Sequence, residues 1–268
     1  MITKADIQFV RSLQDKAART ANGLFVAEGD KVVEELLREK AWRVERLFVL
    51  DGSRIKSPQA EVVTVKDMER MSAFKSVPKS LAVVHIPQRA LAPASADELT
   101  IALDEVQDPG NLGTIIRTAD WYGIRRIVCS PTTADCWGPK VVQATMGALL
   151  RVEVVGCDLV EWLRDARRRD VPTYATTLNG DDIHRAALTQ GGVIVMGNEG
   201  KGVSKEVQAE VEHNLFIPPW PADRRGSESL NVAIATAIVC ENFRRPKWFS
   251  AHIVGLIEKK VEIRAKKL

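Results

Sequence analysis

Apolar and polar positions follow two recurring patterns along the chain. Short apolar runs, such as residues 193–196 and 215–217, are typical of buried strands. Between them lie stretches in which apolar side chains recur at helical spacing, as at positions 32, 33, 36 and 37. Strands that alternate with helices of this length predict an α/β fold with a mostly parallel sheet.

The predicted elements form two groups. The first group covers residues 1–90, with strands expected at 24–27, 44–50, 62–65 and 81–86, helices at 4–14, from about 30, and at 66–74, and a basic polar turn at 16–22. The second group covers residues 99–250, with strands expected at 101–106, 126–130, 152–156, 171–177, 192–197 and 214–218 and helices at 111–123, 139–150, 158–169, 181–188, 204–211 and 229–245. Residues 91–98 are rich in Pro, Ala and Ser and are expected to be a linker, while 251–268 are expected to form a basic C-terminal helix.

Composition favours a soluble globular protein, with 45% apolar and 27% charged residues. The four cysteines form no C-x-x-C and the four histidines are scattered, so we expect neither a metal site nor a disulfide framework, and a reducing cytoplasmic compartment. The most apolar segment, 230–240, is shorter than the roughly 20 residues that span a bilayer. We therefore expect no membrane association.

The charge is uneven. The net charge is only +3, but residues 244–268 carry eight basic and two acidic side chains. This balance permits an anionic partner without requiring one.

The first candidate site is the segment DPGNLGTIIRTA at 108–119, which follows a predicted strand and opens a predicted helix. Asn111 is expected to cap that helix. Arg117 lies opposite the apolar stripe of the helix, on the face that also carries Thr114 and Trp121. It is therefore either a solvated surface arginine or an arginine offered to a phosphate or a partner subunit.

Two further candidate segments follow strands later in the chain. The loop GNEGKG at 197–202 follows the run 193–196, but it does not satisfy the Walker A spacing, and no G-x-G-x-x-G fingerprint follows a strand. The tripeptide Ser229-Leu230-Asn231 opens the last large helix, where it either caps the helix or lets backbone N–H groups hold a ligand.

Together the three segments resemble the SpoU/TrmH family of RNA ribose 2′-O-methyltransferases in the SPOUT superfamily. The pattern N-x-G-x-x-x-R-[TS]-A is matched at 111–119, the G-N-E-G-x-G loop at 197–202, and the I-P…S-L-N-V signature at 217–218 and 229–232. The segment GLFVAEG and the helix after it are similar to the L30e-like substrate-binding domain that precedes many such enzymes.

The resemblance implies a C-terminal parallel-sheet domain with a deep trefoil knot, preceded by a small L30e-like α/β domain for RNA binding. It implies S-adenosylmethionine as cofactor, RNA as substrate (ribosomal rather than transfer RNA), and a homodimer with the active site near the subunit interface. The catalytic residues that it implies are Asn111, Arg117, Glu199, Ser229 and Asn231, and the cofactor contacts are Gly197, Gly200, Ile217, Pro218, Leu230 and Asn231. Arg117 would orient the ribose or its phosphate, because an arginine with a pKa above about 12 is a poor general base.

One departure from the family pattern leaves alternatives open. Twelve residue steps separate Ile217 from Ser229, where the family usually has eight, and the longer loop carries Trp220, Arg224 and Arg225. A non-catalytic RNA-binding protein that retains the fold is therefore an alternative. A dinucleotide-dependent enzyme is a weaker one, because the glycine fingerprint is missing.

Overall fold

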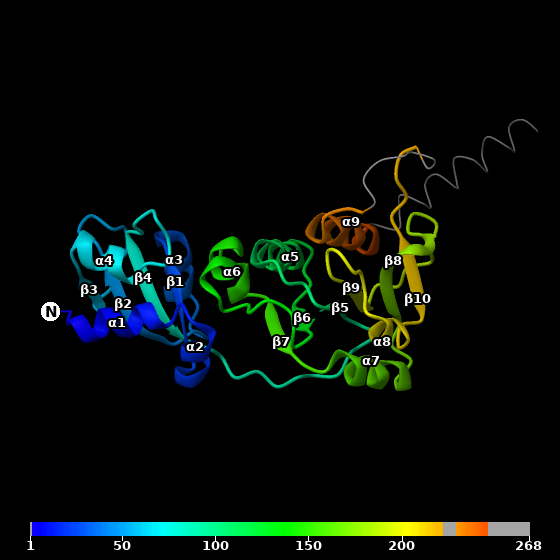
Figure 1. Cartoon of the computed structure of the whole chain (residues 1–268), viewed down its shortest axis with the longest axis horizontal. Coiled ribbons are helices and arrows are strands. Elements are labelled where there is room, and N and C mark those ends of the chain that lie inside the picture. The colour runs from blue at the N-terminus through cyan, green and yellow to red at the C-terminus, as the bar shows by residue number, and fades with distance from the viewer. Residues whose placement is uncertain (1, 222–228, 246–268) are drawn as a thin grey trace, which may run out of the picture.

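A computed structural model describes residues 2–221 and 229–245 and shows two sheets joined by an extended segment (Figure 1). The predicted helix at 251–268 and the arginines at 224 and 225 lie outside the described residues. The first sheet has the order β1-β4-β2-β3, and only β2 and β3 run parallel. Its elements are α1 (Lys4–Ser12), α2 (Lys16–Asn22), β1 (Leu24–Glu28), α3 (Asp30–Arg38), β2 (Val44–Val49), β3 (Ala60–Val62), α4 (Val65–Met71) and β4 (Ser80–His85).

The side chains of β1 alternate between the two faces of the sheet and contribute to two hydrophobic cores in this N-terminal unit. Leu24 and Val26 pack with α1 and α4 on one face, while Phe25 and Ala27 belong to the core on the α3 face. Successive side chains of a strand point to opposite faces, so four residues of β1 supply both cores, two to each.

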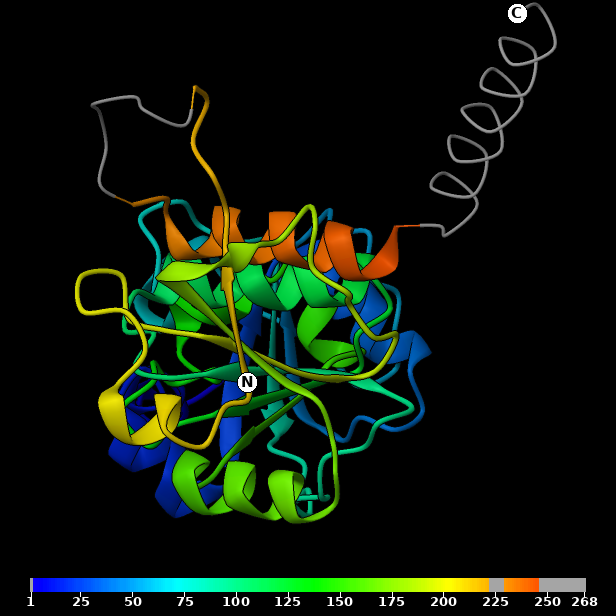
Figure 2. The same ribbon diagram turned by 90° about the vertical axis from the view of Figure 1, so that its right-hand side faces the viewer.

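The second sheet is entirely parallel, with the order β10-β8-β9-β5-β6-β7. Helices α5, α6 and α9 cover one face, and α7 and α8 cover the other (Figure 2). This confirms the predicted α/β class with a parallel sheet. Its elements are β5 (Leu99–Leu103), α5 (Pro109–Trp121), β6 (Arg126–Cys129), α6 (Pro139–Ala144), the 3₁₀ turn η1 (Ala148–Leu150), β7 (Glu153–Gly156), α7 (Leu159–Arg168), β8 (Thr173–Asp182), β9 (Gly192–Met196), α8 (Lys205–Gln208), β10 (His213–Phe216) and α9 (Val232–Arg244).

Three predicted elements were wrong. Residues 16–22 form α2 instead of a turn, because Asp15 caps its start and Gly23, at a φ of 64°, ends it. The helix expected at 139–150 breaks into α6 and η1, because Met146 and Gly147 both have positive φ. The helix expected at 181–188 is absent from the described structure, because β8 continues to Asp182 and pairs again with β10.

Helix α5 packs closely on α6 through Gly113. A Cβ added at Gly113 would lie 2.4 Å from the Cβ of Ala144 and 3.2 Å from the carbonyl oxygen of Val141. The glycine therefore sets how near α5, which carries two of the candidate site residues, can approach its neighbour.

We expect Gly113→Val to lower the free energy of unfolding by about 2 kcal/mol or more, because the added methyl groups overpack this contact. Denaturant unfolding checks the effect, with Thr114→Val on the exposed face of the same helix as control. Equal unfolding midpoints for the two variants would contradict the packing argument.

Candidate functional site

Three side chains from the three candidate segments join in one hydrogen-bonded chain. The Nδ2 atom of Asn231 donates to Oδ1 of Asn111 at 2.9 Å, and Nδ2 of Asn111 donates to Oε1 of Glu199 at 2.9 Å. The three residues are 32 to 120 positions apart in the sequence. They meet near the carboxyl ends of β5 and β9, where the strand order reverses and open α/β sheets bind ligands.

We call the hydrogen-bonded series Asn231–Asn111–Glu199 the amide chain, and the start of α9 determines its orientation. Oδ1 of Asn231 accepts hydrogen bonds from the backbone N–H groups of Ala233 and Ile234, which leaves its Nδ2 free to donate. Nδ2 of Asn231 therefore meets the oxygen of Asn111, and the amino group of Asn111 must face Glu199. The cap of α9 therefore determines the direction of both hydrogen bonds in the amide chain.

Asn111 itself is not the cap of α5, contrary to the sequence prediction. Asp108 occupies the cap position and accepts from the backbone N–H of Asn111 at 2.7 Å, with Pro109 starting the helix. The acidic side chain is the better fit there, because an anion is stabilised at a helix N-terminus. The side chain of Asn111 is thereby released for the contact with Glu199.

The loop after β9 is closed on itself by Asn198. Its backbone exchanges two hydrogen bonds with Gly202, and its Oδ1 accepts from the N–H groups of Gly200 and Lys201. A Cβ at Gly197 would lie 2.2 Å from the carbonyl carbon of Gly202, so glycine is required where the loop folds back. Glu199 lies at the tip of this loop, facing Asn111.

Two acidic residues after β5 were missed by the sequence analysis. Asp104 is buried, and its Oδ2 accepts from the backbone N–H of Ser204 at 2.7 Å. The neighbouring Glu105 has a φ of 59°, and its carbonyl oxygen accepts from Nδ2 of Asn198. Both contacts tie the glycine loop to the end of β5. A carboxylate directly after a fully buried strand was the signal that could have identified Asp104.

The space beside this loop has features of a polar ligand site. Ala175 of β8 pairs with Asn214, but the next pair is Asp181 with Leu215, so residues 176–180 leave the ladder with β10. Within this bulge the hydroxyl of Thr177 is buried and has no hydrogen-bond partner among residues 2–221 and 229–245. Buried polar groups rarely remain unpaired, so a ligand atom at this position would satisfy it.

Other predicted site residues are placed near this region without joining the chain. Ile217 and Pro218 follow β10 directly, and Gly200 lies in the glycine loop. Ser229 and Leu230 precede the cap of α9 and are exposed. Arg117 is exposed on α5, and no hydrogen bond between described residues connects Arg117 or Ser229 with the amide chain.

Thiol chemistry is disfavoured in this domain. Burial raises the pKa of Cys136 and of Cys240 to about 12, and that of Cys157 to about 11. Burial also raises the pKa of Cys129. All four thiols are free and stay protonated near neutral pH, which makes them poor nucleophiles.

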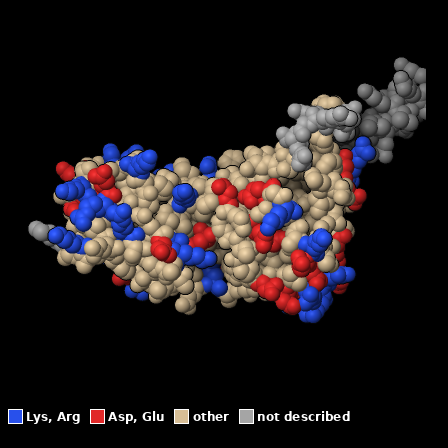
Figure 3. Space-filling view, in the orientation of Figure 1, with Lys and Arg blue, Asp and Glu red and all other residues tan. Residues whose placement is uncertain are grey.

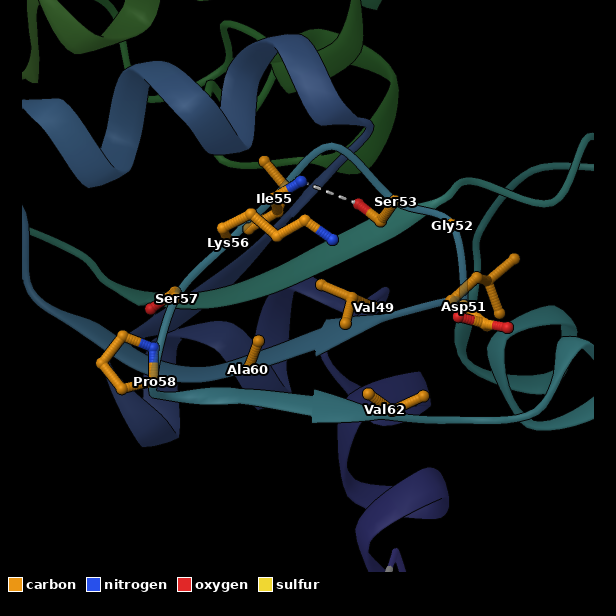
Figure 4. A pocket seen from close by; sticks show the side chains of 11 residues that line it. Val49, Asp51, Gly52, Ser53, Ile55, Lys56, Ser57, Pro58, Ala60 and Val62 are labelled. Atoms are coloured by element: carbon orange, nitrogen blue, oxygen red, sulfur yellow. Dashed lines mark hydrogen bonds between the residues drawn. The ribbon is translucent and has the colours of Figure 1, made fainter.

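A cavity lies elsewhere, in the N-terminal unit. It has a volume of about 530 Å³ and lies between the loop 51–58 and strands β2 and β3, with Val49, Ala60 and Val62 on its floor (Figure 4). None of its lining residues belongs to the three candidate segments. In residues 2–221 and 229–245 no group of three or more His, Cys, Asp or Glu side chains could hold a metal, and no helix could cross a membrane.

Comparisons with known proteins cover both units. The model of the SpoU rRNA Methylase family matches residues 98–241, and that of the MRM3-like substrate binding domain matches residues 4–92. The chain is 31% identical to the 23S rRNA (guanosine(2553)-2′-O)-methyltransferase RlmP of Bacillus subtilis over 240 residues, which is 87% of this chain and 94% of that protein.

Solved structures are also similar. A TrmH-family protein from Porphyromonas gingivalis superimposes with a TM-score of 0.82 at 38% identity, over 91% of this chain and 99% of the other. An AdoMet-bound rRNA methyltransferase from Sinorhizobium meliloti superimposes with a TM-score of 0.79 at 28% identity, over 91% and 96% of the two chains.

Asn231→Asp tests the amide chain directly. Asp caps a helix as well as Asn, so we expect the melting temperature to change little. Asp cannot donate to Asn111, so Glu199 loses its anchor and backbone hydrogen exchange at residues 199–201 should increase several-fold. Exchange mass spectrometry measures this, with Asn242→Asp on the same helix as control. Unchanged hydrogen exchange at residues 199–201 would show that the order of the glycine loop does not depend on the amide chain.

Proposed function

Because the chain belongs to the SpoU rRNA methylase family, we propose that it methylates a ribose 2′-hydroxyl in ribosomal RNA. The chain is an RNA methyltransferase that uses S-adenosylmethionine. The observation that carries the proposal is the amide chain Asn231–Asn111–Glu199, which brings all three motif segments to one place at the switch point of the sheet.

The cofactor fits the region between the glycine loop and the ends of β8 and β10. Gly197, Gly200, Ile217, Pro218, Leu230 and Asn231 would hold it, largely through backbone groups. We add Thr177 to this set, because its buried hydroxyl has no partner in the described part of the chain. When bound, S-adenosylmethionine supplies a methyl group activated by a sulfonium.

The side chains around the cofactor would position the ribose. A 2′-hydroxyl is a weak nucleophile, so its orientation toward the methyl group should supply much of the rate. Asn111, Ser229 and Asn231 offer amide and hydroxyl groups for this role. Glu199 accepts a hydrogen bond from Nδ2 of Asn111, and this contact would hold the glycine loop against the start of α5. Arg117 would bind the ribose or its phosphate through its planar fork and would stabilise charge, because it stays protonated.

A homodimer would explain the place of Arg117. On α5 the same exposed face carries Trp121, which is 84% exposed, and neighbouring α9 exposes 53% of Ile234. Large exposed apolar side chains close together are typical of interaction surfaces. A second copy packed on this face would cover them and would place the active site, with Arg117, near the subunit interface.

The N-terminal unit, predicted as residues 1–90 with an L30e-like fold, is proposed to bind RNA. Lys and Arg side chains gather over this unit in Figure 3, and Lys66, Lys75 and Lys79 are among its exposed residues. The linker 91–98 then leads to the methyltransferase domain at 99–250, for which we propose the knotted SPOUT topology. A basic helix at 251–268 would add salt-sensitive RNA affinity. A cytoplasmic location, where the enzyme would meet ribosomal RNA, is part of this proposal.

Arg117→Ala is expected to lower kcat/KM for RNA by at least about 100-fold, as for loss of a preorganised charge-stabilising group. The affinity for S-adenosylmethionine, measured by calorimetry, should stay within two-fold. Arg169→Ala, at the C-cap of α7, is the control. An Arg117→Ala enzyme that still methylates RNA at nearly the wild-type rate would overturn the assignment.

Mapping of 2′-O-methyl positions in RNA from cells with and without the protein tests the function itself. One ribosomal nucleotide should lose its methyl group in the deletion strain. If no nucleotide changes and calorimetry detects no cofactor binding, the non-catalytic RNA-binding alternative is correct instead.

A further inference from the structure

The junction between the two units contains a buried ion pair. Arg19 of α2 is only 4% exposed, and its Nε and Nη2 both donate to Oδ2 of Asp135, at 3.2 and 2.6 Å. Its Nη1 also donates to the carbonyl oxygens of Leu13 and Gln14. Oδ1 of Asp135 accepts from the backbone N–H of Trp137. Removal of either charge would leave the other buried without its partner, so this contact strongly favours the docked arrangement.

An aromatic cluster lies beside the ion pair. The ring of Phe25 from β1 is 4.9 Å from that of Trp137 and 6.0 Å from that of Trp42. Nε1 of Trp42 donates to the carbonyl oxygen of Leu150, which lies in the second unit. Arg89, at the start of the connecting segment, lies over the Trp42 ring and donates to the carbonyl oxygen of Val152. The two units thus share one apolar core across the junction.

A second polar bridge leads from the junction to α5. Arg151 donates to Oε2 of Glu35 on α3 at 3.0 Å, and to both carboxylate oxygens of Asp120 near the end of α5. Hydrogen bonds donated to the Asp120 carboxylate raise the pKa of Arg151. A Cβ at Gly147 would lie 2.2 Å from the carboxylate of Glu35, so this side chain lies directly against the backbone of Gly147. Helix α3 is therefore tied to the helix that carries Asn111 and Arg117.

We propose that this junction makes the two units one rigid body, and that Arg19 and Glu35 are positioning residues that set the spacing between the RNA held by the N-terminal unit and the methyl-transfer site. The proposal rests on the proposed function, because it assumes that RNA contacts both units. Domains joined by a linker move relative to each other by default unless their interface is large and apolar. The shared core and the two polar bridges meet that condition.

A fixed spacing has a chemical consequence for the substrate. An RNA that contacts both units must present its target ribose at a set distance and orientation from the surface that the N-terminal unit binds. Folded RNA can satisfy this requirement, and a rigid enzyme does not lose affinity to the ordering of a flexible linker. A short stem-loop that reaches only the methyltransferase domain gains nothing from the spacing.

The test uses a double variant that carries both Arg19→Met and Glu35→Gln, and compares it with a matched control. The control, Arg38→Met with Glu34→Gln, removes an exposed ion pair within α3 by the same residue changes. Spin labels at Lys66→Cys and Arg168→Cys, both exposed, report the distance between the units by electron resonance, in a Cys157→Ser background. The full chain is used, and Glu35→Gln alone serves if the double variant does not fold.

We expect a narrow distance distribution for the wild type and the control, and a broad one for the double variant. The KM for a long 23S rRNA fragment that contains the mapped nucleotide should rise at least five-fold more than the KM for a stem-loop with the same nucleotide. The kcat for the long fragment and the affinity for S-adenosylmethionine should change less than two-fold.

Two results would overturn the inference. One is a distribution that stays narrow in the double variant. The other is a broad distribution with equal changes in KM for the long and the short RNA. If the wild type methylates neither RNA, the proposed function fails. The distance distributions still decide whether the junction is rigid. RNA affinities from filter binding then decide whether the rigid junction serves RNA binding.

Discussion

The candidate site depends on the capping of α9 by Asn231. A side-chain amide has one accepting and one donating end, and the backbone N–H groups at the start of α9 occupy the accepting end. The donating end then determines the orientation of Asn111, and Asn111 determines where the carboxylate of Glu199 lies. A local property of one helix is in this way converted into the arrangement of a site built from distant segments.

The candidate site also depends on the topology of the parallel sheet. Parallel strands place the loops after β5, β8, β9 and β10 at the same edge, and the reversal of strand order beside β5 opens space between them. Gly197 lets the glycine loop fold tightly on itself, and the buried Asp104 holds the far end of that loop against β5. The amide chain, the cofactor region and the start of α5 therefore lie together because of topology, and only their fine orientation depends on individual side chains.

The sequence predicted the strands of the second unit and the three motif segments well, because buried parallel strands are continuous apolar runs followed by polar loops. It failed where the structure depends on backbone conformation or distant pairing. Helix α2 has little apolar periodicity and depends on its caps, the break after α6 depends on positive φ at Met146 and Gly147, and the length of β8 depends on its second contact with β10. The contact of Asn231 with Asn111 spans 120 positions, and only the family resemblance indicated that the two segments meet.

The apolar core that crosses the junction also bears on how such enzymes diversify. The rings of Phe25 and Trp42 on one side pack against the ring of Trp137 on the other, and Arg19 is paired with the oppositely charged Asp135. Grafting of the first unit from a relative would bury a mismatched surface or an uncompensated charge, at a cost of roughly 3–5 kcal/mol for the charge alone. That cost is a large part of the net stability of an ordinary domain. New RNA specificities are thus expected to arise in this lineage by changes on the outer surface of the N-terminal unit, with the junction inherited intact, and not by exchange of whole modules.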